Sequence, residues 1–118
     1  MSSETAPQPS RSEDYETAAE LFGVLSTPIR LRIIGALCSG EKNVSQLLQD
    51  VEVSQPNMSQ QLNVLYRAGV VDKRRDGAQI YYRIADETVV RVCKAVCSQI
   101  RGDEQEDRAA GGDPAGAQ

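Results

Sequence analysis

Six short amide and hydroxyl side chains lie close together between residues 54 and 61, and side chains of this type hydrogen-bond to the base edges of DNA. They are Ser54, Gln55, Asn57, Ser59, Gln60 and Gln61. Apolar residues interrupt them at helical spacing and predict a helix with one buried stripe, made of Met58, Leu62, Leu65 and Tyr66. Ser54 suits the N-cap, Pro56 the first turn and Gly69 the C-terminal end. The solvated face of an ordinary amphipathic helix would look similar, so the DNA-binding interpretation depends on the residues after Gly69.

The segment after this helix is basic. Two β-rich runs flank Asp76-Gly77, which is a strong short-range signal for a hairpin. Four cations lie on the two runs, namely Lys73, Arg74, Arg75 and Arg83. A base-reading helix followed by a basic hairpin predicts a winged helix-turn-helix, whose hairpin contacts the DNA backbone or the minor groove.

The elements that must position these residues can be predicted from hydrophobic periodicity. We expect helices over residues 14–25, from Pro28 to Ser39-Gly40, over 43–49, from Ser54 to Gly69, and from about Asp86 to about Arg101. The fold class is therefore mainly α with a β-hairpin wing, with five helices and two strands. Residues 13–101 form the domain, and residues 1–12 and 102–118 are expected to be disordered because Ser, Pro, Gly, Ala and acidic residues dominate there.

Two helical faces have no obvious partner within so small a domain. The first helix gathers Tyr15, Ala18, Ala19, Phe22 and Leu25 on one face. The last helix repeats apolar residues at near-heptad spacing, at Val89, Val92, Cys93, Val96, Cys97 and Ile100. We expect a symmetric homodimer, built mainly by the last helix with help from the first.

The charge is distributed unevenly along the 118 residues, whose net charge is −4. Residues 28–101 carry eleven Lys or Arg against seven Asp or Glu, and the remaining residues are strongly acidic. The predicted domain can therefore bind a polyanion although the whole chain is negative. No apolar run is long enough to cross a bilayer and the N-terminus lacks the features of a secretory signal, so we expect a cytoplasmic protein without membrane contact.

The order of elements and several motifs resemble the ArsR/SmtB family of repressors. The resemblance covers about residues 14–101 and rests on Leu25-Ser-Thr-Pro-Ile-Arg-Leu-Arg-Ile-Ile34, Gly40-Glu41, Val44, Ser54-Gln-Pro-Asn-Met-Ser-Gln-Gln-Leu62, Leu65-Tyr-Arg-Ala-Gly-Val-Val71, Arg75-Asp-Gly77 and Ile80-Tyr-Tyr-Arg-Ile84. It implies a cytosolic homodimer that binds double-stranded operator DNA, as an inverted repeat, and leaves it when an inducer binds. Inducers in this family are metals, metalloids, oxidants or reactive sulfur species.

Two inducer sites of the family are missing from this chain. Where arsenite- and cadmium-responsive members carry Cys-Val-Cys, this chain has Asn43-Val44-Ser45. Zinc-responsive members use histidines and carboxylates on the last helix, but this chain has no histidine and keeps only Asp86. The three cysteines remain as inducer candidates.

Cys93 and Cys97 are one helical turn apart, about 5–6 Å between Cβ atoms, so their thiolates can chelate one soft ion. Cys38 or a cysteine of the second subunit could supply the third sulfur that As(III) or Sb(III) prefers. Alternatively, Cys38 with Cys93 or Cys97 forms a redox or persulfide switch, or all three are packing residues. DNA binding itself is expected to need no cofactor.

The sequence offers no catalytic site. It has no histidine, no Gly-rich phosphate loop and no base beside Ser54, Ser59 or Cys93. The remaining alternative to a DNA-binding repressor is a protein-interaction module in which the hairpin contacts a protein.

Overall fold

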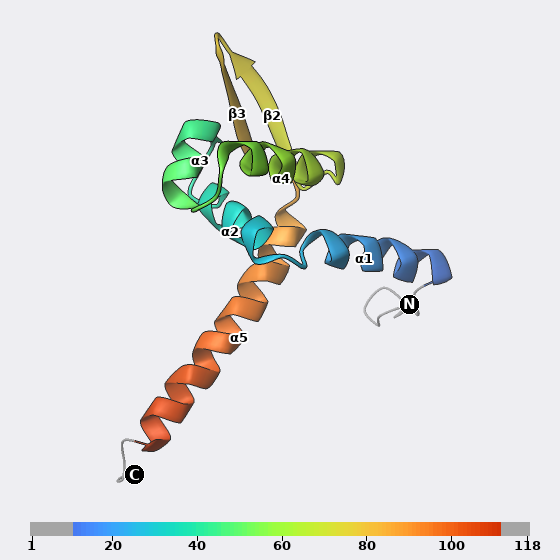
Figure 1. Ribbon diagram of the computed structural model, residues 1–118. Coiled ribbons are helices and arrows are strands. Elements are labelled where there is room, and N and C mark those ends of the chain that lie inside the picture. Colours follow the sequence, from blue (N-terminus) through green and yellow to red (C-terminus); the bar gives the residue numbers. More distant parts are fainter. Residues whose placement is uncertain (1–10, 112–118) are drawn as a thin grey trace.

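The computed structural model describes residues 11–111 and gives five helices and a small antiparallel sheet (Figure 1). The elements are α1 (Ser12–Val24), α2 (Pro28–Leu37), β1 (Lys42–Asn43), α3 (Val44–Asp50), α4 (Gln55–Arg67), β2 (Val71–Asp76), β3 (Gln79–Ile84) and α5 (Glu87–Gly111). The five helices and the hairpin of the predicted winged helix-turn-helix are confirmed. The predicted number of strands is wrong, because β1 adds a third.

The strand order is β1-β3-β2, and both pairings are antiparallel. β1 is only two residues long, and it pairs Lys42 with Tyr82 and Asn43 with Tyr81. It thereby joins the segment before α3 to the base of the wing. A two-residue strand carries no alternating pattern, so periodicity could not predict it.

The tip of the wing lies one residue later than Asp76-Gly77 suggests. Asp76 still pairs with Gln79, so Gly77 and Ala78 form the two-residue loop. Gly77 has a φ of 65°, and no residue other than glycine has a positive φ among those described. A positive φ at the first loop position alone fits a type II′ turn, whereas a type I′ turn at Asp76-Gly77 would have needed it at both positions.

Local capping sets both ends of α4. The Ser54 hydroxyl accepts a hydrogen bond from the backbone N–H of Asn57 at 3.2 Å, as its predicted N-cap role requires. At the other end Gly69 has a φ of 80°, the backbone N–H of Val70 donates to the carbonyl of Leu65, and that of Gly69 donates to the carbonyl of Tyr66. These two bonds form a Schellman motif, which directs the chain from the helix into β2.

The core lies where α2, α3, α4 and the start of α5 meet the base of the wing. Its buried side chains are Leu25, Ile33, Ile34, Leu37, Leu47, Val51, Met58, Leu62, Leu65, Val70, Val71, Val89 and Val90. The predicted stripe of α4 is confirmed for Met58, Leu62 and Leu65. It is wrong for Tyr66, which is 39% exposed because its ring lies outside the core, beneath the Lys73 ammonium.

Helices α1 and α5 project away from this core in different directions (Figure 1). Large apolar side chains on both remain exposed: Tyr15 by 64%, Phe22 by 58%, Val96 by 55% and Ile100 by 55%. The described residues leave these faces largely uncovered, as the sequence predicted.

Helix α5 ends at Gly111, so the predicted end near Arg101 is corrected. Residues 1–10 and 112–118 of the predicted tails lie outside the described residues. Within the described part, no helix has the length and apolar character to cross a membrane.

Candidate nucleic-acid interface

The polar residues predicted to face DNA divide into an exposed and a bonded group. Ser54, Gln55, Ser59 and Gln60 are exposed along α4. Asn57 and Gln61 are only partly exposed, and their amides bond to each other: Gln61 Nε2 donates to Asn57 Oδ1 at 2.9 Å. The exposed group can adapt to a ligand, whereas the bonded pair has a fixed orientation.

Arg30 of α2 holds the bonded pair in place. Its Nη1 donates to Gln61 Oε1 at 2.7 Å, and its Nε donates to the backbone carbonyl of Val24 at 2.6 Å. Nη2 lies 3.5 Å from the carbonyl of Gly23. One guanidinium therefore ties the C-terminal end of α1 to the side of α4 that carries Gln61. No local pattern in the sequence indicates a partner for Arg30 that lies 31 residues away.

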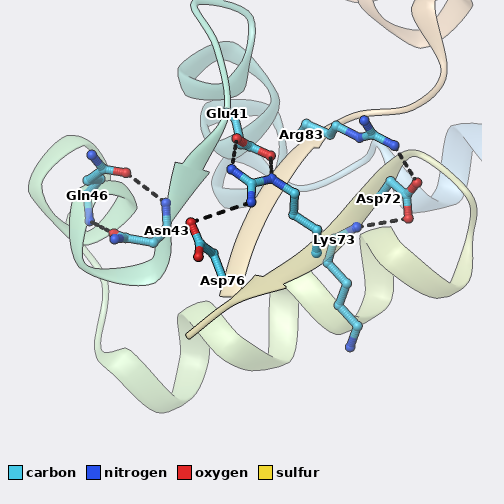
Figure 2. Close-up of polar contacts among 8 residues, drawn as sticks. Glu41, Asn43, Gln46, Asp72, Lys73, Asp76 and Arg83 are labelled. Carbon is cyan, nitrogen blue, oxygen red and sulfur yellow. Dashed lines mark hydrogen bonds and ion pairs between the residues drawn. The ribbon is translucent and has the colours of Figure 1, made fainter. Parts of the chain in front are cut away.

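The wing cations differ in how strongly they are engaged (Figure 2). Arg74 makes a bidentate ion pair with Glu41, at 2.7 Å from Nε and 2.8 Å from Nη2, and its guanidinium lies 4.9 Å from the Tyr81 ring centroid. A weaker contact joins Arg74 to Asp76 at 3.7 Å. Arg74 thus links the wing to the segment before β1.

The other three wing cations are more available. Arg83 Nη2 donates to Asp72 Oδ2 at 2.9 Å, and Lys73 lies 4.4 Å from the Tyr66 ring centroid. Arg75 is exposed and makes no ion pair, side-chain hydrogen bond or ring contact with any residue of the described range 11–111. Arg75 is therefore the wing cation with the least to give up when it binds a phosphate.

The ion pairs favour the charged forms of their carboxylates. The hydrogen bond from Arg74 lowers the pKa of Glu41, and the hydrogen bond from Arg83 followed by the Lys73 backbone N–H lowers the pKa of Asp72. Near neutral pH these carboxylates remain ionised and keep the two arginines in place.

The three cysteines lie apart from this surface and line one cavity between α1, α2 and α5. The cavity has a volume of about 410 Å³ and its walls are mostly apolar, with Phe22, Leu31 and Val92 beside Cys38, Cys93 and Cys97. Burial, and then the neighbouring Cys97 and Cys38, raises the pKa of the Cys93 thiol. The thiols thus come from two elements that face each other across a shared space.

The cavity does not bring the thiols together as a ready-made metal site. Among the side chains that the structure describes, no group of three or more His, Cys, Asp or Glu residues is arranged to hold a metal ion. Cys38 and Cys97 are exposed and Cys93 is partly buried. A three-sulfur site would need either a local rearrangement or a thiol from a second chain.

Comparison with known proteins connects this architecture to regulators. The sequence model described as "Bacterial regulatory protein, arsR family" matches residues 27–73. The chain is 38% identical over 90 residues to the biofilm growth-associated repressor of Agrobacterium fabrum, covering 76% of this chain and 77% of the relative.

Two solved structures resemble the fold closely. The crystal structure of the AntR antimony-specific transcriptional repressor has a TM-score of 0.77 at 31% identity, and the match covers 84% of this chain and 90% of that one. The homodimeric winged helix-turn-helix DNA-binding domain Mb0332 of Mycobacterium bovis has a TM-score of 0.66 at 32% identity, covering 84% and 91%.

Proposed function

Because this chain belongs to the arsR family of bacterial regulatory proteins and is a transcriptional repressor of the ArsR/SmtB type rather than an enzyme, we propose that it binds operator DNA as a homodimer and is released by a thiol-directed inducer. The observation that carries the proposal is the placement of an exposed polar helix face beside a basic wing, on a fold whose three thiols gather elsewhere. A DNA-binding repressor acts where the chromosome is, in the cytoplasm.

In this proposal α4 lies in the major groove and the wing contacts the backbone or the minor groove. The exposed Gln55, Ser59 and Gln60 contact base edges or nearby phosphates. The Ser54 hydroxyl stays close to the protein backbone at the start of α4, because it caps the helix. Lys73, Arg75 and Arg83 bind phosphates, and Arg74 mainly orients the wing through Glu41. Asn57 and Gln61 contribute in the fixed orientation that Arg30 imposes.

Two copies are needed because one reading helix covers only one half-site. The exposed Val96 and Ile100 of α5, together with Phe22 of α1, supply the apolar surface for a second copy. The homodimeric relative of similar fold supports this assembly. The operator of this chain should be an inverted repeat with half-sites about 34 Å apart or slightly more.

The inducer is proposed to act on Cys38, Cys93 and Cys97. One chemistry is chelation of As(III), Sb(III) or a soft metal ion, which the antimony-specific relative supports by its name. The other is oxidation of Cys38 with Cys93 or Cys97, in which two thiols lose two protons and two electrons to an oxidant or persulfide and form a cross-link. The cavity that all three thiols line supports both chemistries. Either reaction would move α5 against α2 and change the spacing of the two reading helices.

Operator release tests both chemistries in one experiment. Reduced protein on operator DNA is titrated separately with arsenite, antimonite, zinc, cadmium and a persulfide donor, and release is followed by gel shift and mass spectrometry. Chelation predicts release without a cross-link. A divalent metal ion displaces the thiol protons, so its affinity should rise with pH. Arsenite and antimonite combine the thiol protons with their own hydroxyl groups to form water, so their affinity should change little near neutral pH. Oxidation predicts a cross-linked mass that requires Cys38 and disappears with reductant. A Cys93→Ser/Cys97→Ser variant that still responds to every reagent would show that these cysteines only pack.

Two measurements test the DNA surface. Gln60→Ala should reduce discrimination between operator and random DNA, because a good base contact contributes ~1–3 kcal/mol. Steep weakening of binding with salt would support DNA, whereas a salt-insensitive partner would support the protein-interaction alternative.

A further inference from the structure

Two hydrogen bonds in series join Arg30 to Gln61 and Gln61 to Asn57, and we call this series the relay. The chemistry of the three side chains fixes which atom donates and which accepts in each bond. A guanidinium carries only donors, so Gln61 must turn its Oε1 toward Arg30, and the 2.7 Å contact shows that it does. The Gln61 Nε2 then faces Asn57, where it donates to Oδ1 at 2.9 Å. In other settings an amide can be rotated to exchange its oxygen and nitrogen. Here the arginine at one end removes that freedom from both amides.

The relay ends at the Nδ2 group of Asn57. Its Oδ1 already accepts from Gln61, and no residue within the described part of the chain accepts a hydrogen bond from Nδ2. Asn57 is partly exposed and lies in the first turn of α4, the end of a reading helix that contacts base edges. Asn57 therefore offers its Nδ2 hydrogen-bond donors to the bases of the groove that α4 enters.

This polarity matters because the major groove distinguishes bases by donors and acceptors. Guanine and thymine present the acceptors O6 and O4, whereas adenine and cytosine present the amino donors N6 and N4. An asparagine free to rotate can match adenine with one donor and one acceptor. Both purines also present the acceptor N7, so the distinction lies at the exocyclic group, where an asparagine that offers only its Nδ2 hydrogens matches O6 or O4 and not an amino group.

We propose that Arg30 and Gln61 are specificity-determining positioning residues, which hold Asn57 as a hydrogen-bond donor and so set a preference for a keto base, guanine or thymine, on one strand at one position of each operator half-site. The proposal rests on the proposed function, because it requires α4 to enter the major groove. Arg30 does not touch DNA in this scheme and acts through two amides in series.

The Gln61→Glu variant tests the direction of the relay. A glutamate keeps the bond to Arg30 but has only acceptors, so Asn57 must turn Nδ2 inward and expose Oδ1. The exposed acceptor should then favour the amino bases, adenine or cytosine. The keto-to-amino preference at that position should shift by about three- to tenfold, the effect of one hydrogen bond.

The experiment selects bound sequences from a library of random-sequence DNA duplexes with the full-length protein. Wild type should show a keto base at the position, Asn57→Ala should lose the preference there, and Gln61→Glu should invert it. Arg30→Met should leave both amides free to rotate and broaden the preference. Asn63→Asp adds the same charge at an exposed position of α4 outside the relay, and it should keep the wild-type preference.

The outcomes separate the relay from the proposed function. A wild type that enriches no sequence would contradict the function itself. If Asn57→Ala changes the base preference at one position and Gln61→Glu keeps the wild-type preference there, the relay is overturned. Gln61→Glu keeps the Arg30 bonds that Arg30→Met would remove. A fold defect in Arg30→Met would therefore leave the Gln61→Glu test intact, and circular dichroism checks the folding of both variants.

Discussion

The side formed by α4 and the wing differs from the face shared by α1 and α5 in how many of its side chains find partners within one chain. On the side of α4 and the wing, Arg30, Arg74 and Arg83 each have a bonded partner within the chain, and α4 packs its apolar stripe into the core. On the other side, Phe22, Val96 and Ile100 are more than half exposed, and the first two line a mostly apolar cavity. The arginines of the first side are held in place within one chain, whereas the apolar side chains of the second side need a covering partner.

This difference suggests a division of labour. Side chains that already have fixed orientations, such as Arg30, Gln61 and Arg74, bind a ligand with little ordering cost. An incompletely covered face can change its packing when its thiols react, because few contacts hold it in one arrangement. The sensitivity of the protein to an inducer should therefore reside in α5 and not in α4.

The strongest test of this contrast is a charge on the uncovered face. Val96→Asp would bury a carboxylate at the interface between two copies, so the dimer should dissociate. Loss of one half-site contact should lower operator affinity by about 100-fold or more. Sedimentation and gel shift measure the two effects. Ser98→Asp adds the same charge at an exposed position two residues along the helix and should leave the dimer intact. A wild type that sediments as a monomer at micromolar concentration would contradict the assembly.

A smaller effect should separate two neighbouring wing arginines. Arg75→Ala should weaken binding to operator and random DNA alike and reduce the slope of log affinity against log salt by about 1. Arg74→Ala breaks the ion pair with Glu41, so it should loosen the wing and raise the Glu41 pKa toward its ordinary value. Titration of binding at several salt concentrations, with a pH titration of Glu41 by nuclear magnetic resonance, measures both. Equal salt slopes in wild type and Arg75→Ala would remove Arg75 from the phosphate contacts.

The connection between α4 and the wing should be sensitive to one glycine. At a φ of 80°, Gly69 occupies a conformation that costs a side-chain-bearing residue about 1–2 kcal/mol, and the space around it is open, so the whole cost arises from the backbone. Gly69→Ala should lower the free energy of unfolding by that amount in urea denaturation. Gly69→Asn should cost less, because asparagine tolerates the left-handed region. Equal losses for both variants would point to a cause other than backbone conformation.

The smallest expected effect concerns Cys93 and pH. Burial raises the pKa of its thiol above the ordinary value of 9.0, so the folded chain holds the proton more tightly than the unfolded chain. The stability this contributes is fully present below pH 9.0 and is lost as pH rises through the folded pKa. Between about pH 8 and about pH 10, wild type should therefore lose more stability than Cys93→Ser, measured by urea denaturation at each pH. The rate of Cys93 alkylation should rise over the same range.

The elements and their order could be predicted from local sequence. Helix periodicity, the caps at Ser54 and Asp86, and the positive φ that glycine permits at residues 69 and 77 all act within a few residues, so they can be recognised along the chain. The family was predicted from the same motifs, and the unmatched apolar faces of α1 and α5 from their periodicity.

Which polar residues are engaged, by contrast, depends on how the chain packs. Arg30 meets Gln61 across 31 residues and Arg74 meets Glu41 across 33, and no local pattern specifies such pairs. Strand β1 exists because β3 offers it an edge, and Tyr66 lies outside the buried stripe, with Lys73 over its ring. The physical reason is common to these cases: hydrogen bonds, ion pairs and ring contacts depend on distances that only the folded chain sets.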